Sequence, residues 1–152
     1  MKIMAVDYGT SRTGLAVCDR TEFLASPVGV IHDKSFGGTL KKIAAAVEEF
    51  DVKEVIVGHP LNMDGTAGEK AHLCEKLATM LRELVNVPVY LWDERQTTMQ
   101  AYTYLDQSEV YGKKRKEMID EVAATVILES YLAYRKNMKE KEAKRKAQAE
   151  EQ

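Results

Sequence analysis

The chain has 152 residues, of which 45% are apolar and 30% are charged, and its formal net charge is −2. These values are ordinary for one globular domain with a sizeable core. They give no overall sign of a polyanionic partner, so any such case must rest on local patches of charge. No stretch approaches the about 20 apolar residues of a membrane span, and Cys18 and Cys74 lack metal-ligand spacing, so we expect a cytoplasmic protein without membrane contact.

The first predicted strand is the apolar run at residues 3–6, which ends on Asp7. Because polar residues do not alternate with the apolar ones, this run is expected to be covered on both faces, as a central strand is. Gly9 and Gly14 mark a tight turn before a second apolar run at 15–17, so the two runs predict a hairpin. Asp7 therefore lies where a buried strand leaves the core, and its carboxylate is expected either to bond turn amides or to bind a cation.

The pattern that follows alternates apolar runs with helical spacing. In chain order, the predicted elements are an edge strand at 22–31 that contains Pro27, a helix that ends near residue 51, a strand at 54–58, a helix from about 67 to 84, a strand at 87–92, a helix from 97 or 98 to about 107, and a last helix from about 118. This β-β-β-α-β-α-β-α-α order predicts the α/β class, with a mixed five-stranded sheet that carries helices on both faces.

The end of the chain differs in composition from the rest. Residues 137–152 are rich in Lys, Glu, Ala and Gln and nearly free of large apolar side chains. Such a segment either extends the last helix into solvent or is disordered. The folded domain is therefore expected to span residues 1–136, with 137–152 as a charged extension.

Three acidic positions are expected to meet at one edge of this sheet. Asp7 ends the first strand, and Glu94 ends the fifth beside Asp93. Asp120 opens the last helix on the side that carries Ala124 four residues later, although a helix N-cap role also explains it. The first and fifth strands should run parallel, which brings their ends to the edge where open α/β sheets usually bind ligands.

Acids gathered in this way repel one another unless hard divalent cations neutralise them, and carboxylate oxygens suit Mg²⁺ or Mn²⁺. Such a cluster is typical of two-metal phosphodiester cleavage, in which one ion activates the water and a second stabilises the leaving oxygen. The sequence has no Ser/His/Asp arrangement, and Cys18 lies within an apolar run, so no side chain offers a better nucleophile.

Four motifs carry a resemblance to a known family. They are Asp-Tyr-Gly-Thr at 7–10 with Arg12 and Gly14, Gly-His-Pro-Leu-Asn-Met-Asp-Gly-Thr at 58–66, Trp-Asp-Glu-Arg at 92–95 with Thr97 and Thr98, and Ile-Asp-Glu-Val-Ala-Ala at 119–124. In this order and spacing, the chain resembles the YqgF/RuvX family of Holliday junction resolvase-like proteins, which have an RNase H-like fold. His59 and Lys70 replace the family's more usual aliphatic residue and arginine, which concerns substrate contacts rather than the chemistry.

The resemblance implies a metal-dependent nuclease that acts on structured nucleic acid. The substrate would be precursor ribosomal RNA, in 5′-end maturation of the small-subunit 16S rRNA, or branched DNA such as a Holliday junction. The resemblance also implies Asp7, Glu94 and Asp120 as catalytic acids that bind Mg²⁺ or Mn²⁺, in a monomer or homodimer. Related resolvases place the second acid after the fourth strand, where this chain has Asp64, so Asp64 and Asp93 remain alternatives to Glu94.

Several polar and basic side chains are candidates for substrate contacts. Arg12 in the first turn and Arg95 after the fifth strand could bind phosphate, and Asn62 could orient a phosphate or a water. A predicted connector before the last helix holds a basic cluster that could bind a nucleic-acid backbone, namely Lys113, Lys114, Arg115 and Lys116. A solvated charge or an ordinary turn explains each of these residues as well.

Two other functions fit parts of the sequence. Asp7-x-Gly9-Thr10 followed by Gly14 resembles the first phosphate loop of actin-like ATPases and phosphotransferases, but those proteins need two such domains, and this chain has no second Asp-x-Gly-Thr. A non-catalytic RNA-binding module would keep the same fold without turnover. Metal-dependent cleavage separates a nuclease from both, and ATP hydrolysis tests the first.

Overall fold

The computed structural model describes the backbone at residues 1–96 and 112–151 and the side chains at 1–95 and 122–151. The elements are β1 (Ile3–Asp7), β2 (Arg12–Cys18), β3 (Ala25–His32), α1 (Phe36–Glu49), β4 (Glu54–His59), α2 (Glu69–Leu84), β5 (Val89–Asp93), the 3₁₀ turn η1 (Glu94–Gln96) and α4 (Gly112–Glu150). The helix expected between 97 and 107 lies outside the described residues.

The five strands form one mixed sheet in the order β3-β2-β1-β4-β5. β1 pairs antiparallel with β2, and β2 pairs antiparallel with β3. β1 also pairs parallel with β4, which pairs parallel with β5. The mixed five-stranded sheet with the first strand at its centre is therefore confirmed, and β1, β4 and β5 all end at one edge, which we call the carboxyl edge.

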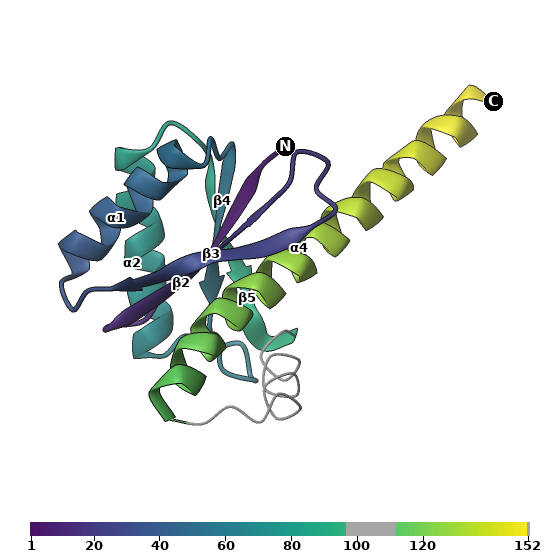
Figure 1. Ribbon diagram of the computed structural model, residues 1–152. Coiled ribbons are helices and arrows are strands. Elements are labelled where there is room, and N and C mark those ends of the chain that lie inside the picture. The colour runs from purple at the N-terminus through teal and green to yellow at the C-terminus, as the bar shows by residue number, and fades with distance from the viewer. Residues whose placement is uncertain (97–111, 152) are drawn as a thin grey trace.

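Helices cover both faces of the sheet, as predicted (Figure 1). Successive residues of β1 alternate between the two layers of the core because side chains of a strand point to opposite faces. Met4 and Val6 belong to the cluster built with α1 and α2, whereas Ile3 and Ala5 belong to the cluster built with α4. The apolar part of β1 is thus fully buried, which explains its unbroken apolar run.

The strand β3 is an outermost strand of the sheet, next to β2, as Pro27 predicts. Pro27 pairs with Ala16, and the register between β2 and β3 shifts between Leu15 and Ala16. Proline has no backbone N–H for a ladder, so edge strands and bulges are where a sheet tolerates it.

The last helix is longer than expected. α4 begins at Gly112, so the basic cluster at 113–116 lies in its first turns, and the prediction of a connector there is wrong. Lys, Arg, Glu and Met all favour helix, and Gly112 only begins the run rather than interrupting it. The same helix continues through residues 137–150, which are exposed. No helix in the described part of the chain is long and apolar enough to cross a membrane.

Candidate active site

Two of the three predicted acids meet at the carboxyl edge. Asp7 is the last residue of β1, and Glu94 is the first residue of η1, directly after β5. The Glu94 side chain lies inward and the residue is only 9% exposed. A side-chain hydrogen bond joins it to Asp7. The fold thus brings together two carboxyl groups that are far apart in sequence.

Gly58, near the end of β4, makes room for this pair. β4 lies between β1 and β5, so its backbone runs beneath the space that the two acids share. A Cβ atom at Gly58 would collide with Glu94 Oε1 and would lie 2.9 Å from Cδ1 of Ile127. Only glycine therefore lets the Glu94 carboxyl rest against the strand. The sequence shows this glycine in a motif, but its contact with Glu94 could not be deduced from the motif.

Burial sets the electrostatics of the pair. Desolvation raises the pKa of the Glu94 carboxyl above its ordinary value, and attraction to Lys70 together with the hydrogen bond to Asp7 offsets this only in part. A hydrogen bond between two carboxyl groups needs a proton on one of them, because two carboxylates so close repel each other. A bound cation would satisfy both groups in place of that proton.

The donor set fits a hard divalent cation, since Asp7 and Glu94 offer carboxylate oxygens only. Within the side chains that the structure describes, no group of three or more His, Cys, Asp or Glu residues could hold a metal ion. Asp120 lies in α4, but its side chain is outside the described residues. The two acids therefore supply part of a site, and a third ligand from α4 remains a prediction.

Asp93 turns away from this pair. Its carboxylate accepts hydrogen bonds from Arg95, with Oδ2 at 2.6 Å from Nη2 and 2.8 Å from Nε. The Arg95 partner holds the pKa of the Asp93 carboxyl below its ordinary value. Arg95 also reaches the carbonyl oxygen of Met63 at 3.5 Å. Asp93 and Arg95 thus form an ion pair that fastens the loop after β4 to the end of β5.

In the loop between β4 and α2, polar side chains form hydrogen bonds with other groups of the same loop. Asn62 Nδ2 donates to Thr66 Oγ1 at 2.9 Å, and the Asp64 carboxylate accepts from both the amide and the hydroxyl of Thr66. These bonds hold the pKa of Asp64 below its ordinary value. Gly65 has a φ of 87°, which favours glycine. Asn62 and Asp64 therefore shape this loop, and none of these bonds joins them to the Asp7–Glu94 pair.

A groove of about 660 Å³ lies between the β1–β2 turn and the first turns of α2. Its lining is Tyr8, Gly9, Thr10, Ser11, Arg12, Glu69, Lys70 and Leu73. The turn is tight, because a Cβ at Gly9 would collide with the carbonyl oxygen of Arg12. Arg12 and Lys70 place positive charge in this groove, and Lys70 also attracts Glu94. Arg12 was a predicted site residue, whereas the sequence singled out Lys70 only as a departure from a motif.

For the basic cluster at 113–116, the structure describes the position of the backbone only. It lies in the first turns of α4, on the helix that also carries Asp120. The side chains of Lys113, Lys114, Arg115 and Lys116 are outside the described residues. Their contact with substrate therefore stays a prediction.

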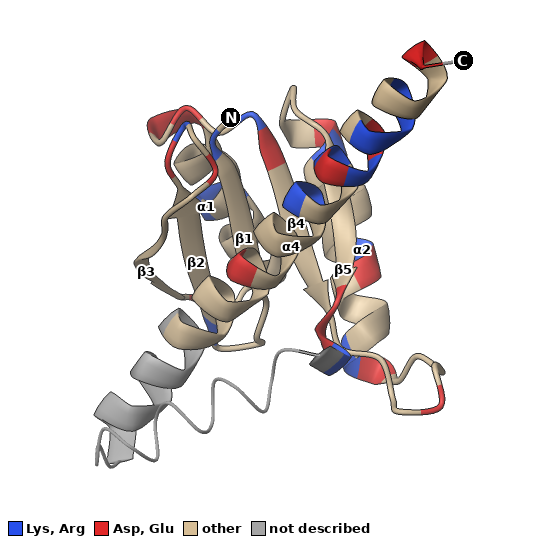
Figure 2. Ribbon diagram, turned by 90° about the vertical axis from the view of Figure 1, so that its right-hand side faces the viewer, with Lys and Arg blue, Asp and Glu red and all other residues tan. Residues whose placement is uncertain are grey.

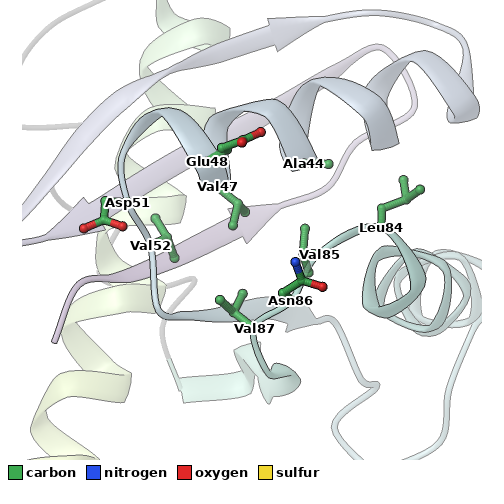
Figure 3. A pocket seen from close by; sticks show the side chains of 9 residues that line it. All are labelled: Ala44, Val47, Glu48, Asp51, Val52, Leu84, Val85, Asn86 and Val87. Carbon is green, nitrogen blue, oxygen red and sulfur yellow. The ribbon is translucent and has the colours of Figure 1, made fainter.

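The opposite edge of the sheet, which we call the amino edge, has a different character. A hollow of about 250 Å³ lies there between α1 and the segment that joins α2 to β5 (Figure 3). It is lined by Ala44, Val47, Glu48, Asp51, Val52, Leu84, Val85, Asn86 and Val87. Its charged groups are the acids Glu48 and Asp51, which do not suit a polyanion.

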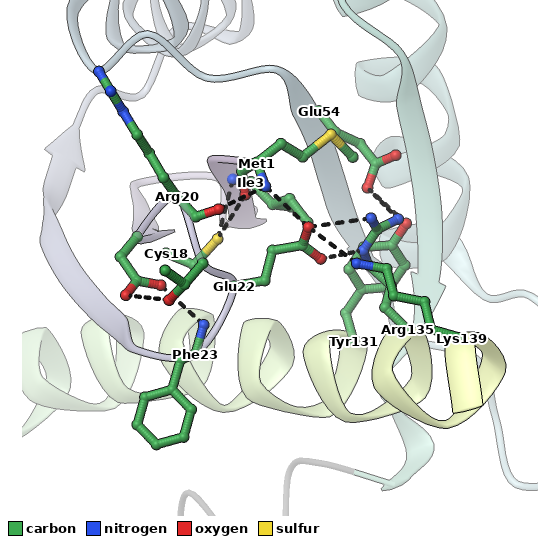
Figure 4. Close-up of polar contacts among 12 residues, drawn as sticks. Met1, Ile3, Cys18, Arg20, Glu22, Phe23, Glu54, Tyr131, Arg135 and Lys139 are labelled. Atoms are coloured by element: carbon green, nitrogen blue, oxygen red, sulfur yellow. Dashed lines mark hydrogen bonds and ion pairs between the residues drawn. The ribbon is translucent and has the colours of Figure 1, made fainter. Parts of the chain in front are cut away.

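The amino edge also holds a carboxylate that is surrounded by cations (Figure 4). Glu22 accepts from Arg135 Nε at 2.6 Å, from the α-ammonium group of Met1 at 2.9 Å and from Lys139 Nζ at 3.4 Å. The hydrogen bond from Arg135 is the main reason that the pKa of Glu22 falls to about 2. This cluster fastens α4 to the turn between β2 and β3.

Comparison with known proteins gives one family. The family model described as "RuvX: Holliday junction resolvase" matches residues 1–134. A protein of Halothermothrix orenii named "Putative pre-16S rRNA nuclease" is 38% identical over 138 residues, which are 91% of this chain and 99% of that protein. A protein of Geobacillus kaustophilus with the same name is 41% identical over 134 residues, which are 87% and 97% of the two chains.

Two solved structures share the fold at low sequence identity. T. thermophilus RuvC in complex with a Holliday junction substrate matches with a TM-score of 0.54 and 14% identity, over 84% of this chain and 91% of that chain. Fowlpox virus resolvase with Holliday junction DNA matches with a TM-score of 0.54 and 14% identity, over 88% and 98%. The predicted RNase H-like fold is thus confirmed. With the family model matched over most of its length and relatives about 40% identical, this chain belongs to the RuvX family of Holliday junction resolvase-like proteins.

Proposed function

We propose that this protein is a metal-dependent endonuclease that cleaves phosphodiester bonds in structured nucleic acid, and that residues 1–136 are its nuclease domain. One observation carries the proposal. The Glu94 carboxyl is buried against Gly58 and is hydrogen-bonded to a second carboxyl group, that of Asp7, at the edge where three strands end. Holding a buried carboxyl group beside a second, half-buried one opposes folding, so we infer that the value of the pair lies in what it binds.

The proposed ligands are Asp7, Glu94 and Asp120. When bound, one or two Mg²⁺ or Mn²⁺ ions would supply an activated water and stabilise the leaving oxygen. The chain itself fixes the ligands, since β1 and β5 are strands of the core sheet and Gly58 sets how deeply Glu94 can lie. Burial excludes water from Glu94 and strengthens its attraction to cations.

The groove beside the acids is the proposed path of the scissile strand. Arg12 and Lys70 would hold its phosphates. The absence of a side chain at Gly9 lets the turn close against the carbonyl oxygen of Arg12, which places Arg12 beside the groove. Arg95 is already paired with Asp93, so we assign it to holding the loop at 62–64 rather than to a phosphate contact. The basic cluster at 113–116 would bind backbone on the α4 side.

Precursor 16S rRNA is the proposed substrate, because the relatives at 38% to 41% identity carry that name. A branched DNA is the second candidate, suggested by the name of the matched family. The decisive experiment offers both substrates, a precursor-like RNA and a four-way DNA junction, to the protein with Mg²⁺, with Mn²⁺ and with chelator. Cleavage of either one that needs the metal and is lost in Asp7→Asn supports the proposal.

The contrary results are specific. Equal cleavage by Asp7→Asn would show that the acids are not the catalytic centre. Binding without metal-dependent cleavage would favour a non-catalytic RNA-binding module. ATP hydrolysis by the same sample, abolished by the same substitution, would favour an actin-like ATPase.

A further inference from the structure

The part of α4 beyond the family-matched region is a projecting helix. The family model ends at residue 134, whereas α4 continues to Glu150, sixteen residues further. The helix leaves the sheet and projects past the amino edge (Figure 1). Every residue from 136 to 150 is exposed, so packing does not hold this segment helical. Its helix-favouring Ala, Lys, Glu, Gln and Arg residues extend a helix that the core has already nucleated.

Its first eleven residues, 136–146, carry most of the charge, and we call them the basic arm. The arm has the cations Lys136, Lys139, Lys141, Lys144, Arg145 and Lys146 against the acids Glu140 and Glu142. The rest of the chain is more acidic, since the whole protein has a net charge of −2. Figure 2 shows blue and red segments along the projecting helix. Lys139 reaches Glu22 at 3.4 Å and Lys146 reaches Glu142 at 3.8 Å, and both lysine side chains stay well exposed.

The arm has no surface that suits a protein groove or a second helix. Met138 is its one large apolar side chain and is 45% exposed. A coiled coil needs apolar residues repeated every three or four positions, and a helix that binds in a groove needs the same anchors. What the arm offers instead is a concentration of exposed cations, which is complementary to a polyphosphate backbone.

We propose that the basic arm binds the sugar-phosphate backbone of duplex nucleic acid at a distance from the cleavage site. This inference rests on the proposed function, because the duplex is taken to be the substrate. From residue 120 to residue 141 the axis of α4 rises by about 32 Å, at about 1.5 Å per residue. For the branched-DNA candidate, that is close to one turn of B-form duplex, about 34–36 Å. A duplex that runs along α4 from the proposed cleavage site would therefore meet the arm about one turn from the bond that is cut.

The test uses the full chain with the four outer cations neutralised, Lys141→Gln, Lys144→Gln, Arg145→Gln and Lys146→Gln together. Glutamine keeps the helix propensity, and far-ultraviolet circular dichroism checks that the helix remains. The matched control is Glu140→Gln with Glu142→Gln, which changes the same helix but makes it more positive. Affinity is measured in chelator, so that binding is separated from cleavage, across a series of salt concentrations.

Two four-way DNA junctions serve as probes, with arms of about 6 and about 20 base pairs, which fall short of and exceed one helical turn. On the long-armed junction we expect the quadruple variant to bind at least about tenfold more weakly at low salt. The slope of log affinity against log salt should be smaller by about 0.9 for each phosphate that the variant no longer neutralises. On the short-armed junction we expect equal affinity for both proteins. The control variant should bind the long arms more tightly than wild type.

Each outcome decides the inference. If the quadruple variant shows an unchanged affinity and salt slope on the long-armed junction, the inference is overturned. That result would be expected if the arm instead binds an acidic protein. Metal-dependent cleavage by wild type would still leave the proposed function standing. An equal loss on short and long arms also overturns it, because the contact would then lie near the cleavage site. Wild type that binds neither junction overturns the inference, and wild type that also fails to bind the precursor-like RNA of the cleavage experiment overturns both proposals.

Discussion

The two edges of the sheet each surround a carboxyl group, but with partners of opposite kinds. At the amino edge, Glu22 is surrounded by Arg135, Lys139 and the α-ammonium group, and the pKa of its carboxyl falls to about 2. At the carboxyl edge, Glu94 lies against Asp7, and burial raises the pKa of its carboxyl. Both groups are largely removed from water, but the first is bonded to cations and the second to another acid.

The comparison separates a structural acid, Glu22, from the acid that we propose to be functional, Glu94. The ion pairs of Glu22 use only groups of this chain, so they form on folding and hold α4 in place. A pair of like groups held together is relieved when a proton or a cation binds to it. Substitutions at the two edges should therefore have opposite consequences for stability and for activity.

The largest effect is expected from Glu94→Gln in metal-dependent cleavage. Loss of a ligand carboxylate should lower the single-turnover rate about 10³-fold or more, equivalent to about 4 kcal/mol of transition-state stabilisation. Asp93→Asn is the matched neighbour, and it should retain much of the rate because Asp93 pairs with Arg95. Asp64→Asn should mainly weaken substrate binding. An inactive Asp64→Asn beside a fully active Glu94→Gln would move the second acid to the loop after β4.

A somewhat smaller loss is expected from Gly58→Ala, which leaves every ionisable group in place. The new Cβ would displace the Glu94 carboxyl, and a misplacement of about 1 Å can lower a rate about 100-fold. Gly37→Ala is the control, because a Cβ there meets nothing within 4 Å. The measurement is single-turnover cleavage with thermal unfolding alongside. Full activity in Gly58→Ala would mean that the position of Glu94 against β4 is unimportant.

The amino edge is tested by Glu22→Gln, which should reduce stability and spare the chemistry. The lowered pKa means that Glu22 stabilises the fold above its unfolded pKa of about 4.3, and that this contribution is lost as the pH falls toward about 2. At pH 7 the free energy of unfolding should fall by on the order of 3 kcal/mol. Denaturant unfolding at pH 7 and near pH 3 measures this. A constant difference between the two proteins at both pH values would point to lost packing instead.

The smallest effect is a gain of stability in Glu94→Gln without divalent metal. A raised pKa means that the ionised carboxyl opposes folding, so wild type loses stability as the pH rises above about 4.3, the unfolded value. The variant should therefore be the more stable protein at pH 7, and the two should agree near pH 4. Added Mg²⁺ should raise the melting temperature of wild type only. A variant that is less stable at pH 7 would make Glu94 a structural acid like Glu22.

Local patterns predicted most of the sheet. The unbroken run before Asp7 marked a central strand, and Pro27 marked an edge, because each reflects a constraint that acts within a few residues. The parallel order of β1 and β5 then predicted that Asp7 and Glu94 would share an edge. The start of α4 was missed because a glycine before four basic residues looks like a linker, although those residues favour helix.

The contacts that sequence could not supply join distant positions. Glu22 and Arg135 are 113 residues apart, and neither residue is unusual in its own surroundings. The role of Gly58 likewise depends on where the side chain of Glu94 comes to lie. The third acid, Asp120, is placed on α4 by the backbone only, so its role in the site stays a prediction.

The proline and the register shift at β3 also bear on how copies of this chain could assemble. An exposed edge strand is a template on which another chain can continue the sheet, and proline and bulges interrupt that template. With Pro27 in β3 and the shift beside Ala16, the β3 side resists strand-by-strand growth. Any pairing of two copies through this side would have to rely on side chains rather than on a shared ladder of backbone hydrogen bonds.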